Sequence, residues 1–198
     1  MGEPGIRNPR NREETIPVQR DEPINAVIVA GTNELGDGFF IPNPLVSSPL
    51  ADRGIDEFIV TADIDFFEGY GLGGNDIWRF RNNIASVFAS GDDGNDFLSA
   101  ATNVRGSEVA FTGGAGRDRI RASAPWAASV VAIGGDGNDS IDVDARRAST
   151  IFVTGGDGSD LIVVDARGAA SLVALGGRGR DTLFIRLGTV MTPWPSST

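Results

Sequence analysis

Aspartates at the ends of short glycine-rich segments are the residues of this chain with the clearest capacity for chemistry. The segments read GLGGND (71–76), GDDGND (91–96), GGAGRD (113–118), GGDGND (134–139), GGDGSD (155–160) and GGRGRD (176–181). Their last residues are Asp76, Asp96, Asp118, Asp139, Asp160 and Asp181, at intervals of 20, 22, 21, 21 and 21 residues. Carboxylates at regular spacing can bind a cation, and dense glycine serves a backbone path that Cβ atoms would block.

The residues between these loops alternate between apolar and polar types, which is typical of half-buried β-strands. The apolar residues two and four positions after each Asp are Phe58/Val60, Trp78/Phe80, Leu98/Ala100, Ile120/Ala122, Ile141/Val143, Ile162/Val164 and Leu183/Ile185. Nine positions before each Asp stand Phe67, Val87, Val109, Val130, Ile151 and Leu172. Each repeat is therefore predicted to contain a strand, a glycine loop, a second strand and a second turn.

A period near 21 residues predicts an all-β fold, a parallel β-solenoid with one repeat per coil. Successive coils would stack about 4.8 Å apart, and the apolar columns would fill a narrow core between two parallel sheets. We expect residues 25–187 to form the solenoid, with 25–64 as degenerate repeats that end at Asp37 and Asp56. Residues 1–24 are expected to be a flexible or docking arm, and residues 188–198 a tail or a cap over the open end.

The two edges of this solenoid are predicted to differ, because each coil has only one glycine loop. The second turns instead carry TNVRG, APWAA, ARRA and ARGA, and their arginines are interpreted as a solvated face. On the outward positions, Asp142 falls in one column with Arg121, and Asp165 in one column with Arg186. We predict that these residues form ion pairs between neighbouring strands.

A row of carboxylates about 4.8 Å apart would resist ionisation unless a cation lay between them. The chain has no Cys and no His, so thiolate and imidazole ligands are excluded. Carboxylate and carbonyl oxygens suit a hard cation, and flexible cages of many oxygens suit Ca²⁺ better than Mg²⁺. We therefore predict a calcium ladder along one edge, with up to about five sites between six loops.

The segment GGDGNDSID (134–142) resembles the nonapeptide G-G-x-G-x-D-x-U-x of RTX, or haemolysin-type, calcium-binding repeats. In that family Ca²⁺ lies between the loops of successive coils of a β-roll, bound by the Asp carboxylate and by loop carbonyls. The resemblance implies these roles for Asp118, Asp139, Asp160 and Asp181 and for the backbone of 113–116, 134–137 and 155–158. The full set of candidate ligands is Gly71, Gly73, Asp76, Gly91, Asp93, Asp96, Gly113, Gly114, Ala115, Gly116, Asp118, Gly134, Gly135, Asp136, Gly137, Asp139, Gly155, Gly156, Asp157, Gly158, Asp160, Gly176, Gly179 and Asp181.

The chain departs from the family pattern in three ways. The family has glycine loops on both edges of each coil, whereas this chain has them on one. Leu72 and Asp92 replace the second glycine of the first two loops, which are expected to coordinate less well. Arg117, Arg178 and Arg180 lie within loops, where they would either weaken calcium binding or point outward. The sites beside Asp139 match best.

The composition excludes several classes of function. The net charge is −10 and all 17 basic residues are arginine, which argues against nucleic acid or an anionic membrane surface as partner. No apolar run approaches the roughly 20 residues of a membrane-spanning helix. The absence of His removes the commonest general base and transition-metal ligand, and the absence of Cys excludes disulfides and thiolate metal sites. We therefore expect no enzymatic activity and name no catalytic residue.

Apolar residues also fall on positions that should face outward. They are Phe88, Val131, Phe152 and Val173 on one sheet and Leu161, Val163 and Phe184 on the other. Such a stripe indicates packing against a partner, a second copy or the N-terminal arm. A register error of one residue would also produce it, because it exchanges the two faces of a strand.

The sequence thus predicts a secreted calcium-binding structural protein, such as an adhesin, a surface-layer component or a filament component. Its N-terminus lacks an apolar segment, so we expect export without a cleaved signal peptide. Its partners would be calcium ions and a second copy or a surface or matrix component. The alternative is a calcium-dependent accessory module of a larger secreted enzyme. Binding to ice or polysaccharide is less favoured, because the outward columns mix Ser, Arg, Asp and apolar residues.

Overall fold

The computed structural model describes residues 66–71, 73–81 and 83–188, together with five short strands upstream of them. These strands are β1 (Ile6–Arg7), β2 (Thr15–Ile16), β3 (Val27–Ala30), β4 (Gly38–Ile41) and β5 (Glu57–Val60). The described residues form strands and turns, and none of them belongs to a helix that could cross a membrane. The rest of the predicted arm, the ends of both degenerate repeats and residues 189–198 lie outside the described residues.

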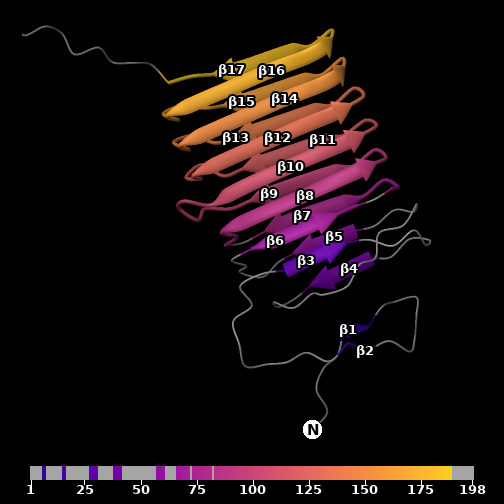
Figure 1. The fold of residues 1–198 in the computed structure, drawn as a ribbon. Helices are drawn as coiled ribbons and strands as arrows, with labels where there is room; N and C mark the ends of the chain where they lie inside the picture. The colour runs from indigo at the N-terminus through magenta and orange to yellow at the C-terminus, as the bar shows by residue number, and fades with distance from the viewer. Residues whose placement is uncertain are drawn as a thin grey trace, which may run out of the picture.

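The strands form a parallel β-solenoid of two facing sheets, as predicted (Figure 1). One sheet has the order β16-β14-β12-β10-β8-β6-β3 and the other the order β17-β15-β13-β11-β9-β7-β5-β4, while β1 and β2 pair separately and antiparallel. The first sheet contains β6 (Phe67–Tyr70), β8 (Ser86–Asp93), β10 (Glu108–Ala115), β12 (Ser129–Asp136), β14 (Thr150–Gly158) and β16 (Ser171–Gly179). The second contains β7 (Ile77–Arg81), β9 (Phe97–Ala101), β11 (Arg119–Ser123), β13 (Ser140–Asp144), β15 (Leu161–Asp165) and β17 (Thr182–Arg186).

The apolar columns of the sequence form the core between the sheets, in the predicted register. Val130 of β12 pairs with Val109 of β10 and with Ile151 of β14, and all three side chains are buried. On the second sheet, Ile141 pairs with Ile120 and Ile162 in the same way. Because each column stacks like on like, one register serves every coil, and a slip by one residue would expose every column at once.

Aromatic side chains cluster in the core of the first described coils. The ring centroids of Phe67 and Phe80 are 4.7 Å apart, and those of Phe67 and Trp78 are 5.7 Å apart, both in edge-on arrangements. Phe111 continues the cluster, 6.0 Å from Phe80. The neighbouring coils place Ala89 and Ala132 at the position of Phe111, and Val153 follows in the next coil, so large aromatic residues of the core are confined to the first described coils.

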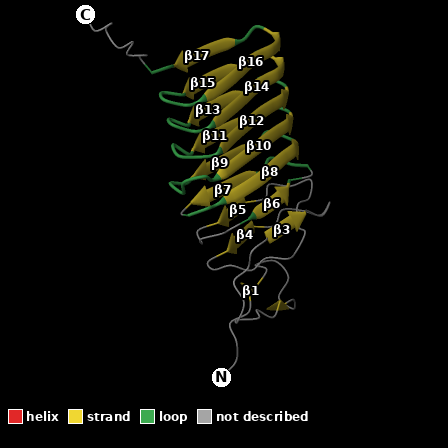
Figure 2. Cartoon of the chain, turned by 60° about the vertical axis from the view of Figure 1, so that its left-hand side comes forward, coloured by secondary structure: helices red, strands yellow, loops and turns green. Residues whose placement is uncertain are grey.

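The repeat pattern predicted that each glycine loop would begin where the first strand of its coil ends. Instead, the strands of the first sheet run on into them, so that β12 includes Gly134 and Gly135. Gly114, Gly135, Gly156 and Gly177 adopt φ between 109° and 115°, which lets the ladder continue through the start of the turn. Longer turns lie on the opposite edge, where they follow the strands of the second sheet (Figure 2).

The outward faces carry the two predicted ion pairs and the apolar stripe. Arg121 lies 3.2 Å from Asp142, and Arg186 lies 3.8 Å from Asp165. Because the register is confirmed, the stripe is not the product of a register error. Its most exposed members belong to the last described coil, where Phe184 is 61% exposed. Leu183 and Ile185, which continue core columns, are exposed there as well.

One loop position stores backbone strain that a substitution should release. Asp92 occupies the position of Gly114 and Gly135 and adopts φ 68°, a left-handed conformation that side chains disfavour. We expect Asp92→Gly to raise the free energy of unfolding by about 1 kcal/mol. Asp93→Ala removes the same charge from the neighbouring position, where φ is not positive. If both variants raise the denaturation midpoint equally, charge and not backbone strain is the cause.

Candidate metal site

The Asp residues that end the glycine loops form a buried column along one edge of the solenoid. Asp96, Asp118, Asp139 and Asp160 are at most 3% exposed. The Oδ1 atom of each accepts the backbone N–H of the equivalent Asp in the preceding coil, at 2.7–2.8 Å, and Asp181 accepts the N–H of Asp160 at 3.1 Å. Each carboxyl group therefore joins two coils, whereas an isolated glycine turn would have its Asp bonded within its own loop.

The second carboxyl oxygen of this column points into the protein. The Oδ2 atoms of Asp96, Asp118, Asp139 and Asp160 are buried and have no hydrogen-bond partner. Each faces the first glycine of its own loop. A Cβ added at Gly134 would lie 2.4 Å from Oδ2 of Asp139 and 2.3 Å from the carbonyl oxygen of Gly155. The missing side chain thus leaves a small space where a carboxyl oxygen and a carbonyl oxygen of the next coil converge.

The same convergence recurs in successive gaps between coils. At Gly113 the two oxygens belong to Asp118 and Gly134, at 2.4 and 2.5 Å from the added Cβ. At Gly155 they belong to Asp160 and Gly176, at 2.1 and 2.5 Å. The first glycine of each loop is therefore required by the packing of its own Asp, and any larger residue would displace the carboxyl group.

Burial raises the pKa of these carboxyl groups far above the usual value for Asp. The pKa of Asp118 rises to about 7, and those of Asp96 and Asp139 rise to about 6. Loss of hydration is the main cause. The backbone N–H that each group accepts acts in the opposite direction, and the neighbouring carboxylates raise the pKa further. The column is therefore costly to ionise unless a positive charge lies beside it, and without such a charge it tends to keep its protons.

A second ladder, which the sequence reasoning missed, lies on the outer side of the same loops. The side-chain oxygen of Asn95 accepts the backbone N–H of Arg117 at 2.8 Å, and that of Asn138 accepts the N–H of Ser159 at 2.8 Å. Asn75 accepts the N–H of Asn95 at 2.7 Å. The recurrence of Asn one residue before the Asp was the available signal. These bonds occupy loop N–H groups without involving the carboxyl column.

The other candidate acidic residues lie apart from this column. Asp93, Asp136 and Asp157 are exposed, and Asp157 is 3.4 Å from the guanidinium of Arg178. Arg117 and Arg180 are also exposed, so the structure has the loop arginines pointing outward. The middle glycines serve close backbone contact: a Cβ at Gly116 would lie 1.6 Å from the carbonyl oxygen of Gly94.

The donor set suits a hard cation in chemistry, although it is sparse. Within residues 66–188, apart from the two that the structure does not describe, no three acidic side chains converge as a ready-made metal cluster. What recurs is one orphaned carboxyl oxygen and one carbonyl oxygen per gap, both buried and both of the type that Ca²⁺ prefers. A cation in such a gap would need further oxygens from loop carbonyls or water.

Comparison with known proteins adds nothing to this geometry. No family model matches the chain, and neither a curated protein nor a solved structure matches it. The resemblance to haemolysin-type repeats therefore rests on the loop residues themselves.

Proposed function

We propose that this chain is an extracellular calcium-binding structural protein whose glycine loops fold around a ladder of Ca²⁺ ions. The observation that carries the proposal is the column of buried, unpartnered Oδ2 atoms in Asp96, Asp118, Asp139 and Asp160. Buried polar atoms without partners are rare in folded proteins, and each needs an explanation such as an ion. An unpartnered carboxyl oxygen at the same position in four successive coils is better explained by a recurrent ligand than by chance.

The ligands of the cation would come from two successive coils. The Asp Oδ2 atom would approach it from one coil and the first-glycine carbonyl from the next, as with Asp139 and Gly155. The Oδ1 atom would keep its hydrogen bond to the preceding coil and hold the carboxyl group in place. Bound Ca²⁺ would supply the positive charge that allows buried carboxylates to ionise at neutral pH. Six loops provide up to about five such gaps.

A structural role outside the cell follows from this coupling of ion binding to folding. Extracellular calcium is high enough to saturate sites of modest affinity, whereas a calcium-poor chain would be looser and easier to export. The exposed apolar residues of the last described coil, including Phe184 and Leu187, suit a partner or a second copy, as in a surface layer or a filament. An accessory module of a larger secreted enzyme would use the same loops and is the alternative.

The test is a calcium titration of EDTA-treated protein followed by far-UV circular dichroism and thermal unfolding. We expect Ca²⁺ to raise Tm by about 10 °C or more, because ligands that bind only the folded state add several kcal/mol when saturating. Mg²⁺ should reproduce little of this gain. A folded protein whose Tm does not respond to millimolar Ca²⁺ would refute the calcium ladder.

A pair of isosteric variants ties the effect to the buried column. Asp139→Asn retains an oxygen that can accept the N–H of Asp118 but removes the charge beside Gly155. It should bind fewer Ca²⁺ ions and lose part of the calcium-dependent gain in Tm. Asp142→Asn removes an equal charge from the exposed outer face, where Asp142 contacts Arg121, and should leave the gain intact. Equal responses of the two variants would show that the effect is nonspecific.

A further inference from the structure

The edge opposite the glycine loops carries a cavity that the calcium ladder does not involve. The cavity has a volume of about 450 Å³ and is lined by Pro125, Trp126, Arg146, Arg147 and Arg167. These residues come from the second turns of three successive coils. Its volume lies within the usual range of small-molecule sites and exceeds that of a single inorganic anion. We call this feature the turn-edge pocket.

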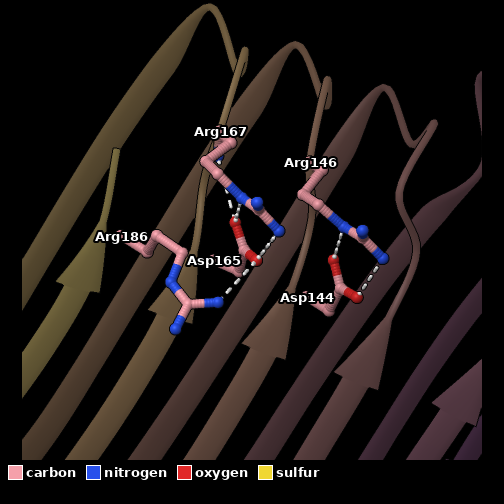
Figure 3. A network of polar contacts seen from close by, with 5 residues as sticks. All are labelled: Asp144, Arg146, Asp165, Arg167 and Arg186. Carbon is pink, nitrogen blue, oxygen red and sulfur yellow. Dashed lines mark hydrogen bonds and ion pairs between the residues drawn. The ribbon is translucent and has the colours of Figure 1, made fainter. Parts of the chain in front are cut away.

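Two of its arginines are held rigidly by neighbouring carboxylates. Arg146 contacts Asp144 through Nε and Nη2, both at 2.7 Å, and Arg167 contacts Asp165 in the same way at 2.8 and 2.7 Å. Figure 3 shows the two forked pairs side by side on neighbouring coils. A guanidinium has five N–H donors, so each arginine retains donors that its Asp does not occupy. Their positions are set before any ligand arrives.

Arg147 is held in a different way and at the expense of backbone strain. Its guanidinium carbon lies 4.6 Å from the centroid of the Trp126 ring, and that of Arg105 lies 4.4 Å from the same ring. Among the described residues, neither Arg105 nor Arg147 forms an ion pair. Arg147 adopts φ 73°. The equivalent turn residue is Gly106 two coils earlier and Gly168 in the next coil, with φ 77° and 78°, whereas in the preceding coil it is Trp126, whose φ is not positive. Strained residues of this kind are concentrated at functional sites.

The charge of this edge is opposite to that of the whole chain. The net charge of the protein is −10, yet the second turns carry four arginines, Arg105, Arg146, Arg147 and Arg167, of which only two are paired with a carboxylate, Asp144 or Asp165. Because Arg forks match the geometry of oxyanions, such a cluster favours a phosphate or sulfate group. The acidic remainder of the molecule would repel a dense polyanion, which favours a small ligand over a nucleic acid.

We propose that the turn-edge pocket binds a small organic anion, namely a tetrahedral phosphate or sulfate group on a body the size of a sugar ring. The free N–H donors of Arg146, Arg147 and Arg167 bind the oxyanion. The ring of Pro125 and the edge of Trp126 provide an apolar wall for the carbon skeleton. Because both the arginine donors and the apolar wall contribute to binding, inorganic phosphate alone binds more weakly than a sugar phosphate.

Isothermal titration calorimetry with glucose 6-phosphate, glucose 6-sulfate, inorganic phosphate and glucose tests the site. We expect saturable binding of both charged sugars, binding at least tenfold weaker for inorganic phosphate, and none for glucose. Comparing the two charged sugars distinguishes a phosphate site from a sulfate site. If no charged sugar binds, or if glucose binds equally well, the proposal is wrong.

The decisive variant is Arg147→Gly, because the next coil already carries glycine, Gly168, at this turn position with a similar φ. It should weaken the charged sugars at least tenfold while leaving Tm unchanged or raised by about 2–4 °C, since the strain is relieved. Arg117→Gln, on the opposite edge, removes an equal charge and should leave binding intact. Unchanged binding in Arg147→Gly, or equal weakening in both variants, would overturn the proposal whether or not calcium binds the other edge.

Discussion

Gly137→Ala should abolish or severely weaken folding, with a loss of more than about 4 kcal/mol in the free energy of unfolding. The added Cβ would lie 1.5 Å from the carbonyl oxygen of Gly116 in the preceding coil. Gly137 also adopts φ 134°, and its N–H donates to the carbonyl oxygen of Asp157 at 2.6 Å. The clash is between two backbones that are hydrogen-bonded into the stack, so it can be relieved only by separating coils.

Gly106→Ala is the matched control for this prediction. Gly106 also has a positive φ, 77°, but a Cβ added there meets nothing within 4 Å. This substitution should cost only about 1 kcal/mol, which is the conformational penalty alone. Chemical denaturation of both variants measures the difference. Similar losses for the two would mean that backbone conformation, and not contact between coils, makes the loop glycines necessary.

The strand register is the part of the fold that the sequence predicted best. The period of 21 residues and the alternation within each strand are one-dimensional signals, and they set the pairing of Val130 with Val109 and Ile151 correctly. The same column logic predicted the ion pair between Arg121 and Asp142. In a solenoid, equivalent positions of successive repeats lie side by side, so the strand register can be predicted from the repeat alignment alone.

Side-chain direction inside the turns was not predictable in the same way. The sequence placed the Asp carboxyl groups on one edge, but it did not indicate that Oδ1 would bond the preceding coil while Oδ2 stayed without a partner. Nor did it place Arg105 and Arg147 over Trp126. Turn conformation depends on individual φ values, such as 73° at Arg147, which residue type does not determine.

In the absence of divalent cations, the protein should become less stable as the pH rises from about 4 to 7. The pKa of Asp118 is raised from 3.8 to about 7 by burial, and those of Asp96 and Asp139 to about 6. In this window the folded state keeps protons that the unfolded chain has released, so rising pH favours unfolding. The stabilisation is complete below pH 4 and is lost once the pH passes the raised values. We expect Tm to fall by about 10 °C between pH 5 and 8.

Asp118→Asn separates the buried column from other titrating groups. The amide oxygen can still accept the N–H of Asp96, but the side chain cannot ionise. In EDTA this variant should therefore have a flatter pH profile and a higher Tm at pH 8 than the native protein. Asp142→Asn, on the exposed face, should keep the native profile. If the Tm of the native protein in EDTA rises with pH, buried carboxyl groups do not control the pH dependence.

The effect of calcium on this pH dependence distinguishes a cation-binding column from a protonated one. If Ca²⁺ occupies the gaps, it competes with protons for the same oxygens, and the loss of stability between pH 5 and 8 should disappear when calcium is added. Asp118→Asn should gain less from calcium than the native protein under the same conditions. If calcium leaves the slope unchanged, the column works with protons alone, as a set of neutral carboxyl groups that join coils through their hydrogen bonds. Thermal unfolding at pH 5 and pH 8, with calcium or EDTA, therefore decides between a cation ladder and a proton-dependent one.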